Sequence, residues 1–118
     1  MRARSISRSL SIAWIALFFL CAAVAAAQGA DERGKTLYAQ KCAVCHGEKG
    51  DGHGPAAASM PVKPTNFKNS KFWQEDAATR IGNSIRNGKG KMPAIAMTPD
   101  EIKDVTDYMT KTFGPGSK

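Results

Sequence analysis

Apolar residues recur at helical spacing in three segments of this 118-residue chain, and glycine- and proline-rich stretches separate the segments. The pattern predicts helices over about residues 31–43, 75–87 and 99–113. No segment shows the sustained alternation of apolar and polar residues that is typical of a strand. The sequence therefore predicts an all-α domain with at least three helices joined by loops.

The last predicted helix has the clearest boundary signals. Thr98 is the expected N-cap, Pro99 the first helical residue and Glu101 the reciprocal partner in a capping box. Glycine and proline at positions 114 and 115 end the helix. Its expected buried stripe consists of Ile102, Val105, Tyr108, Met109 and Phe113.

The two earlier helices carry weaker signals. Asp31 is a candidate cap for the first helix, in which Leu37 and Tyr38 are expected to face inward. In the middle helix, Asn87 and Gly88 form a natural C-terminal stop. The apolar positions of the middle helix are Ala77, Ala78, Ile81 and Ile85.

The first 27 residues have the features of a secretory signal peptide. Arg2, Arg4 and Arg8 provide a positive start, an apolar run follows, and alanines at 25–27 give a cleavage pattern before Gln28. We therefore expect a signal peptide over 1–27. Retention of the apolar run as a membrane anchor is the alternative.

The remaining residues 28–118 are enough for one small domain. The three arginines of the signal account for three of the +7 formal charges, so this domain carries +4. Its lysines are scattered, with no arginine cluster or aromatic stacking motif, which argues against a nucleic-acid partner. The apolar core is thin, since Leu37 is the only leucine after residue 27. We expect a buried apolar cofactor to complete the core, and the chain without it to be largely unfolded.

The most informative motif ends the first predicted helix, where residues 42–46 read Cys-Ala-Val-Cys-His. Two thiols in this spacing can each add to one vinyl group of the same porphyrin, and the imidazole that follows can bind iron. We therefore predict one covalent haem c, attached through Cys42 and Cys45, with His46 as an axial metal ligand.

Other uses of the motif fit less well. A structural zinc site needs four ligands, and the only other Cys or His after residue 27 is His53. A thioredoxin-like dithiol requires a βαβ setting that the pattern lacks. Bis-histidine ligation by His53 is a further alternative, but His53 follows His46 by only seven residues and would have to reach the opposite face of the haem.

Four methionines after residue 27 are candidates for the second axial ligand, namely Met60, Met92, Met97 and Met109. Met109 belongs to the apolar stripe of the last helix. Met92 lies in a loop far along the chain from the haem motif, flanked by glycines and followed by a proline. Such a segment suits a ligand that must reach the second face of the haem, and Met60 and Met97 stay open as alternatives to Met92.

With these motifs the chain resembles the class I c-type cytochromes, which are small monohaem electron carriers, over nearly all of residues 28–118. The resemblance implies the small cytochrome c fold, an all-α fold with three or more helices around one covalently attached haem. It maps the axial methionine of the family onto Met92, which we therefore favour as the metal ligand over Met60 and then Met97. It also implies that the first and last helices cross in contact, with Gly34 permitting the approach and Tyr38 and Tyr108 packed around it.

Two further roles come from the resemblance alone. Pro55 matches the proline whose carbonyl accepts the N–H of the haem histidine, a bond that fixes the tautomer of His46. Asn66 and Trp73 lie in the region that often lines a haem propionate.

These features predict a single-electron carrier in a periplasmic respiratory or dehydrogenase chain, and not an enzyme, because filled axial positions leave no site for a substrate on the iron. The alternatives are a haem subunit of a larger oxidoreductase complex and, on weaker grounds, a haem peroxidase or a gas-binding haem protein. A peroxidase would need a distal histidine and arginine pair, and no clear pair is present, although Arg80 and Arg86 lie in the middle helix.

The expected partners are redox proteins, and lysines around the haem would suit acidic docking surfaces on them. These lysines are Lys41, Lys49, Lys63, Lys89 and Lys91. The signal and the covalent haem together predict a periplasmic location. Membrane contact is expected only if the N-terminal segment is retained.

Overall fold

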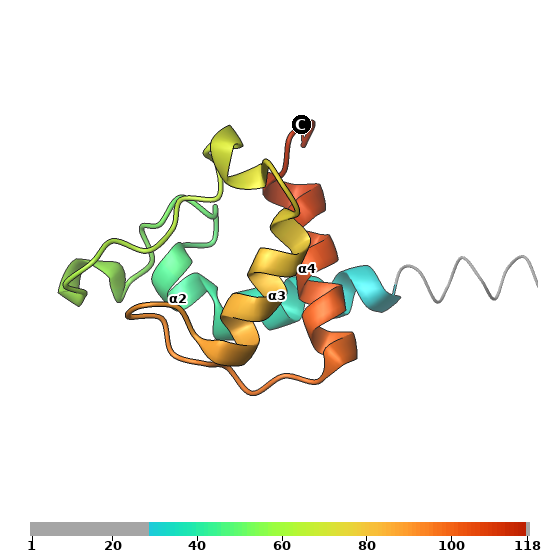
Figure 1. Cartoon of the computed structure of the whole chain (residues 1–118), viewed down its shortest axis with the longest axis horizontal. Helices are drawn as coiled ribbons and strands as arrows, with labels where there is room; N and C mark the ends of the chain where they lie inside the picture. The colour runs from blue at the N-terminus through green and yellow to red at the C-terminus, as the bar shows by residue number, and fades with distance from the viewer. Residues whose placement is uncertain (1–28, 118) are drawn as a thin grey trace, which may run out of the picture. The chain divides into compact units, whose positions relative to one another are not determined.

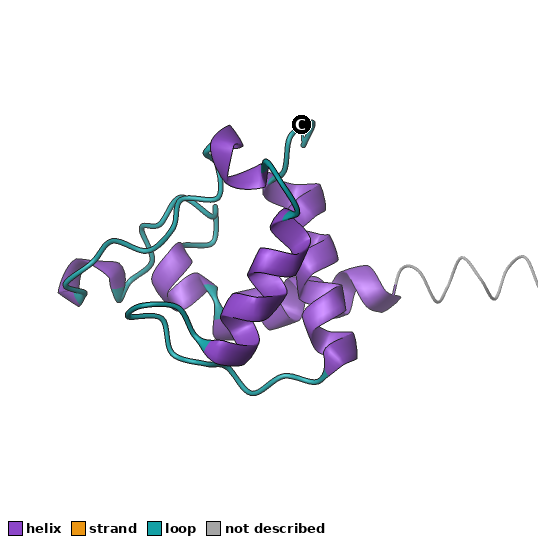
Figure 2. Ribbon diagram, in the orientation of Figure 1, coloured by secondary structure: helices purple, strands orange, loops and turns teal. Residues whose placement is uncertain are grey.

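The computed structural model describes residues 29–117 (Figures 1 and 2). The expected signal peptide over 1–27 lies outside the described residues. By its contacts the chain divides into residues 1–30 and 31–118, and the fold reported below is that of the second unit. Among residues 29–117 there are helices but no strand, apart from an isolated bridge between Lys89 and Met92, so the all-α prediction is confirmed.

Residues 29–41 are helical, and a short helix, α2 (Ala43–His46), follows after a break at Cys42. Two single 3₁₀ turns, η1 (Ala57–Ser59) and η2 (Ser70–Trp73), interrupt the long segment that comes next. The two longest elements after it are α3 (Ala77–Asn87) and α4 (Pro99–Phe113). Helices α3 and α4 pack against each other, and Figure 1 shows α3 crossing in front of α4.

Three predicted boundaries differ from the structure. Asp31 is not an N-cap, because residues 29 and 30 are already helical. The first helix breaks at Cys42 and not after residue 43. The middle helix starts at Ala77 because Glu75 and Asp76 adopt φ angles of 51° and 49°, which a right-handed helix cannot contain.

The predicted capping box of α4 is present in full. The Thr98 hydroxyl accepts a hydrogen bond from the Glu101 amide at 3.2 Å, and the Glu101 carboxylate accepts one from the Thr98 amide at 2.7 Å. Most of the predicted stripe is buried, and Tyr108 is half-buried. Asp104 and Thr106 are also buried, which the apolar pattern did not predict.

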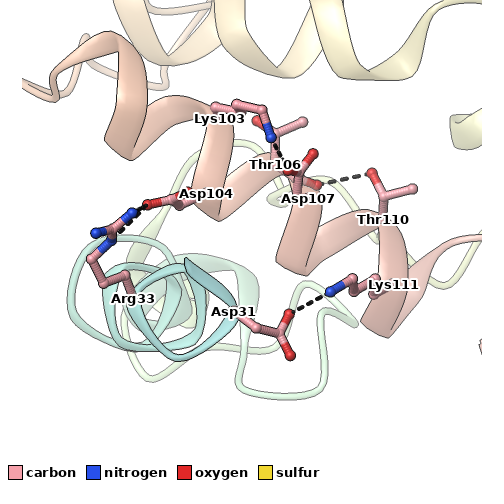
Figure 3. A network of polar contacts seen from close by, with 8 residues as sticks. All are labelled: Asp31, Arg33, Lys103, Asp104, Thr106, Asp107, Thr110 and Lys111. Carbon is pink, nitrogen blue, oxygen red and sulfur yellow. Dashed lines mark hydrogen bonds and ion pairs between the residues drawn. The ribbon is translucent and has the colours of Figure 1, made fainter. Parts of the chain in front are cut away.

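The N-terminal helix crosses α4 in close contact, as the resemblance implied. Gly34 is buried there, and a Cβ atom at this position would come within 2.8 Å of Tyr108 Cβ and still closer to the Asp104 carbonyl oxygen. Ion pairs flank the crossing, with Arg33 to Asp104 at 2.8 Å and Asp31 to Lys111 at 3.0 Å (Figure 3). A residue with no side chain is therefore what lets these two helices meet.

The buried interior joins the N-terminal helix, α3 and α4 to the loop at Phe67. Its members are Tyr38, Cys42, Ala43, Phe67, Ile81, Ile85, Ile102, Val105, Met109 and Phe113. Aromatic rings form much of it, since Tyr38 lies 5.1 Å from Phe113 between centroids and 5.7 Å from Tyr108. Over residues 29–117, no helix has the length and apolar character needed to cross a membrane.

Candidate haem-binding site

The Cys-x-x-Cys-His motif forms a tight turn at α2. The amides of Cys45 and His46 both donate to the carbonyl of Cys42, at 3.2 Å and 2.9 Å, so all three side chains leave the backbone within one turn. Both thiols are free; Cys42 is buried and Cys45 is half-buried. Burial raises the pKa of the Cys42 thiol to about 11, so this sulfur is protonated near neutral pH.

His46 is held by a hydrogen bond to a backbone carbonyl. Its Nδ1 lies 3.0 Å from the carbonyl oxygen of Thr65, which can only accept, so Nδ1 carries the proton. The lone pair is then left on Nε2. Burial lowers the pKa of His46, against a smaller opposite effect of the Thr65 bond, and favours the neutral imidazole. A neutral ring with a free Nε2 is the form that binds a metal.

Pro55 does not have the role that the resemblance implied for it, because the carbonyl bonded to His46 belongs to Thr65. The segment around Pro55 runs beside α2 instead, where the Gly54 amide donates to Cys45 O at 3.1 Å and the Ala56 amide to Val44 O at 2.9 Å. Pro55 is exposed, and the carbonyl bonded to the imidazole lies ten residues further along the chain, at Thr65.

An aromatic ring covers the imidazole. Phe67 stacks on His46 with ring centroids 4.6 Å apart and planes inclined by 22°. The indole Nε1 of Trp73 donates to the backbone carbonyl of Phe67 at 2.7 Å, and the side-chain oxygen Oδ1 of Asn66 accepts from the Lys68 amide at 2.9 Å. The sole side-chain donor of Trp73 is thus used within the protein, which leaves it none for a propionate.

Met92 lies in a small hairpin directly after α3. The amides and carbonyls of Lys89 and Met92 are paired, at 2.9 Å and 3.0 Å, and the Ile95 amide donates to Ile85 O at 2.8 Å. Gly88 starts the turn with φ of 72°, and a Cβ there would come within 2.8 Å of Met92 O. These contacts tie the loop to the end of α3. The side chain of Met92 is half-buried and packs against the core.

The other sulfur and imidazole candidates lie in different surroundings. Met97 is also half-buried against the core, and Met109 is a core residue that is 3% exposed. Met60 follows η1 and is not among the half-buried residues that pack on the core of the described chain. The His53 side chain is 75% exposed, with Nδ1 3.6 Å from an oxygen of Asp51.

The donor set fits haem c. Two unpaired cysteines and a neutral imidazole with a free nitrogen share one turn, and a half-buried methionine in a separate loop packs on the same core. Cys42 and Cys45 would form the thioether links, His46 would bind iron through Nε2, and Met92 would supply the second axial atom.

Comparisons with known proteins identify the family of this chain. The cytochrome c family matches residues 32–113, so the chain belongs to the cytochrome c family and binds covalently attached haem c. It is 37% identical over 89 residues to the cbb3-type cytochrome c oxidase subunit CcoP of Azospirillum brasilense, a match that spans 72% of this chain and 29% of that relative. The fold is similar to a chain of the reducing HAO-like protein complex of Kuenenia stuttgartiensis, with a TM-score of 0.57 and 28% identity over 70% of this chain and 42% of that one.

Sequence reasoning missed Thr65 and Phe67. Thr65 acts through its backbone carbonyl, so its side chain gave no signal. Phe67 was one apolar residue in a loop without periodicity, and only the tertiary fold brings it onto His46.

Proposed function

We propose that this chain is a single-electron carrier domain whose haem has His46 and Met92 as axial ligands. The observation that supports this most directly is the bond from His46 Nδ1 to the Thr65 carbonyl, because it leaves Nε2 free as a ligand atom and raises the basicity of the ring. When bound, the haem iron carries the electron by changing between the ferric and ferrous states, and a thioether ligand raises its potential relative to a second imidazole.

The protein's own residues would keep the structural change between the two oxidation states small. The turn at α2 holds His46 rigidly relative to both cysteines, and the Lys89–Met92 pairing holds the methionine loop against α3. Side chains held in place in this way would move little between the two oxidation states of a bound haem. This favours electron transfer over substrate chemistry at the iron, so we propose that the chain is not itself an enzyme.

Absorption spectra of the purified holoprotein test the ligand assignment. We expect the oxidised wild type to show the weak far-red charge-transfer band of sulfur bound to iron, and Met92→Ala to lose it. Met97→Ala and Met60→Ala are matched controls, since each removes one thioether elsewhere. A band that survives Met92→Ala and disappears in one control would transfer the role to that residue.

Covalent attachment has a separate test. Mass spectrometry of the denatured protein should find one haem per chain, and Cys42→Ala/Cys45→Ala should abolish it. Peroxidase turnover by the folded wild type at a useful rate would support the enzyme alternative instead. Binding of carbon monoxide, with no side chain as the sixth ligand of the iron, would support the gas-binding alternative.

A second candidate is a haem subunit of a larger oxidoreductase complex. Both similar proteins named above are described as members of such assemblies, and this chain spans 29% of the first and 42% of the second. Affinity purification of the tagged chain from its native host, followed by analytical ultracentrifugation, separates the two candidates. A stable stoichiometric oxidoreductase in the eluate favours the subunit; a monomeric haem protein favours the diffusible carrier.

We further propose that residues 1–27 direct export to the periplasm.

We also propose that the redox partners present acidic surfaces to the lysines expected around the haem. All five of these lysines are exposed, including Lys89 and Lys91 beside Met92. Lys89→Glu/Lys91→Glu should slow reduction by the native partner and weaken its salt dependence. The control Lys35→Glu/Lys103→Glu makes the same charge change on the N-terminal helix and α4, and should have a smaller effect.

A further inference from the structure

The face of His46 that Phe67 covers has no role in the function proposed above. Phe67 is 6% exposed, and its ring lies almost parallel to the imidazole, with planes 22° apart. A contact of this kind touches the ligand itself and not the surrounding core alone. It therefore has the geometry to affect how the imidazole is oriented.

The hydrogen bond that His46 donates to the Thr65 carbonyl cannot fix that orientation alone. It restrains one ring atom, Nδ1, at 3.0 Å from the carbonyl oxygen. A ring that keeps this bond can still tilt about the line joining the two atoms. Tilting is resisted when a flat ring is packed against one face, because the movement either forces atoms together or opens a gap in a close-packed interior.

Phe67 is itself fixed through both of its backbone groups. Its amide donates to the carbonyl of Gly50 at 2.7 Å, and its carbonyl accepts from Trp73 Nε1 at 2.7 Å. The first bond ties Phe67 to the loop that follows α2, and the second ties it to η2. The ring that covers His46 is thus carried by a backbone segment that is hydrogen-bonded to the loop after α2 and to η2.

A second ring and a cation support Phe67 from η2 and α3. Phe72 packs on it with centroids 5.0 Å apart and planes inclined by 58°. The Arg80 guanidinium lies 5.3 Å from the centre of the Phe72 ring and donates to three carbonyls in η2 and directly after it. Those carbonyls belong to Phe72, Gln74 and Glu75.

We propose that Phe67 is a positioning residue for His46, that it sets the plane of the imidazole, and that Phe72 and Arg80 hold it in place. The inference rests on the proposed role of His46 as an axial ligand. The plane of an axial imidazole determines how its π orbital overlaps the iron d orbitals, so a neighbour that fixes this plane tunes the electronic structure of the centre.

Electron paramagnetic resonance and proton NMR of the oxidised holoprotein test the proposal, because low-spin g values and the order of haem methyl resonances report the orientation of an axial imidazole. Phe67→Leu keeps an apolar side chain without a flat face. We expect it to shift the g values and to change the order of the haem methyl resonances. Phe67→Tyr retains the ring and should restore the wild-type signals. Phe72→Leu should produce a smaller shift in the same direction.

Phe113→Leu is the matched control. Phe113 is buried and also packs on Phe67, with centroids 6.2 Å apart, and on Tyr38. We expect this variant to lose thermal stability while keeping the wild-type g values. Wild-type signals in Phe67→Leu, or an equal shift in Phe113→Leu, would overturn the proposal.

A measurement on the wild type tests the proposal if Phe67→Leu does not yield a folded protein with bound haem. In the diamagnetic ferrous protein, nuclear Overhauser contacts should join the rings of Phe67 and His46, and their absence would also overturn the proposal. A wild type without a low-spin His/Met spectrum would instead refute the proposed function, and this inference with it.

Discussion

The hydroxyl of Tyr38 donates a hydrogen bond of 2.8 Å to the carbonyl of Gly47, the residue directly after His46. Tyr38 lies on the N-terminal helix and is 2% exposed. The bond ties that helix to the end of the haem motif. Burial raises the pKa of Tyr38 far above its ordinary value, so the hydroxyl remains a donor across the physiological range.

Tyr38→Phe should therefore destabilise the holoprotein by about 1–2 kcal/mol, because the buried Gly47 carbonyl loses its partner while the ring packing is kept. Guanidinium unfolding followed by the haem absorbance measures this. Tyr108→Phe is the control, as Tyr108 packs on the same ring. An unchanged unfolding midpoint in Tyr38→Phe would mean that water satisfies Gly47 equally well.

Gly34→Ala should destabilise the protein by about 2 kcal/mol or more through overpacking at the helix crossing. The added methyl would meet backbone atoms of Asp104, which cannot move aside as a flexible side chain can. Gly82→Ala is the matched substitution inside α3. The nearest atoms to the new methyl there would be side-chain atoms, Arg86 Nη1 at 3.3 Å and Ile102 Cγ2 at 3.5 Å. It should be neutral or stabilising by about 0.5–1 kcal/mol from helix propensity. Equal melting temperatures for the two variants would refute the close-approach argument.

Gly88→Ala should disturb the methionine loop more than Gly90→Ala does. Both residues have positive φ, of 72° and 58°, so alanine costs each position about 1 kcal/mol of backbone strain. Only at Gly88 would the methyl also meet the Met92 carbonyl, at 2.8 Å. The far-red sulfur band and the midpoint potential should fall in Gly88→Ala and be retained in Gly90→Ala. The reverse order would argue that the 89–92 pairing does not position Met92.

Thr106→Val should stabilise the protein by about 1 kcal/mol. The Thr106 hydroxyl is buried and, among the described residues, finds no hydrogen-bond partner, while its carbonyl accepts from Thr110. Valine keeps the shape and the β-branch but removes the unsatisfied polar atom. Thr110→Val, which deletes a satisfied hydroxyl on the same helix, should bring no gain in melting temperature. A loss of stability in Thr106→Val would indicate that a bound water or the haem satisfies the hydroxyl.

Stability should fall as the pH is lowered through the ordinary pKa of histidine, 6.5, because burial lowers the pKa of His46 in the folded state. Below 6.5 the unfolded chain binds a proton that the folded chain does not, and stability rises with pH wherever the unfolded state binds more protons. Iron ligation acts in the same direction, since it also excludes the proton. Unfolding free energies between about pH 7 and about pH 5 measure the slope. His53→Gln removes the other histidine and should leave the pH dependence of the unfolding free energy in place. If this variant lost the pH dependence, the titrating group would be His53 and not His46.

Local signals in the sequence were enough for the haem motif and the last helix. The capping box at Thr98 and Glu101 is a contact between residues three apart, so the local chain specifies it. Cys42, Cys45 and His46 depend likewise on spacing within one turn. The start of α3 was misjudged because a helical period cannot report that Glu75 and Asp76 are left-handed.

What the tertiary structure alone decided is the environment of the imidazole. His46 donates its hydrogen bond to the carbonyl of Thr65 and not to that of Pro55, whose neighbours Gly54 and Ala56 are bonded to carbonyls of α2 instead. Phe67 reaches His46 through a loop of 20 residues with glycines, prolines and no period, where nothing local fixes the path. Residue types and spacing thus determined which chemistry the chain carries, while long-range packing and backbone hydrogen bonds decided which groups surround the ligand.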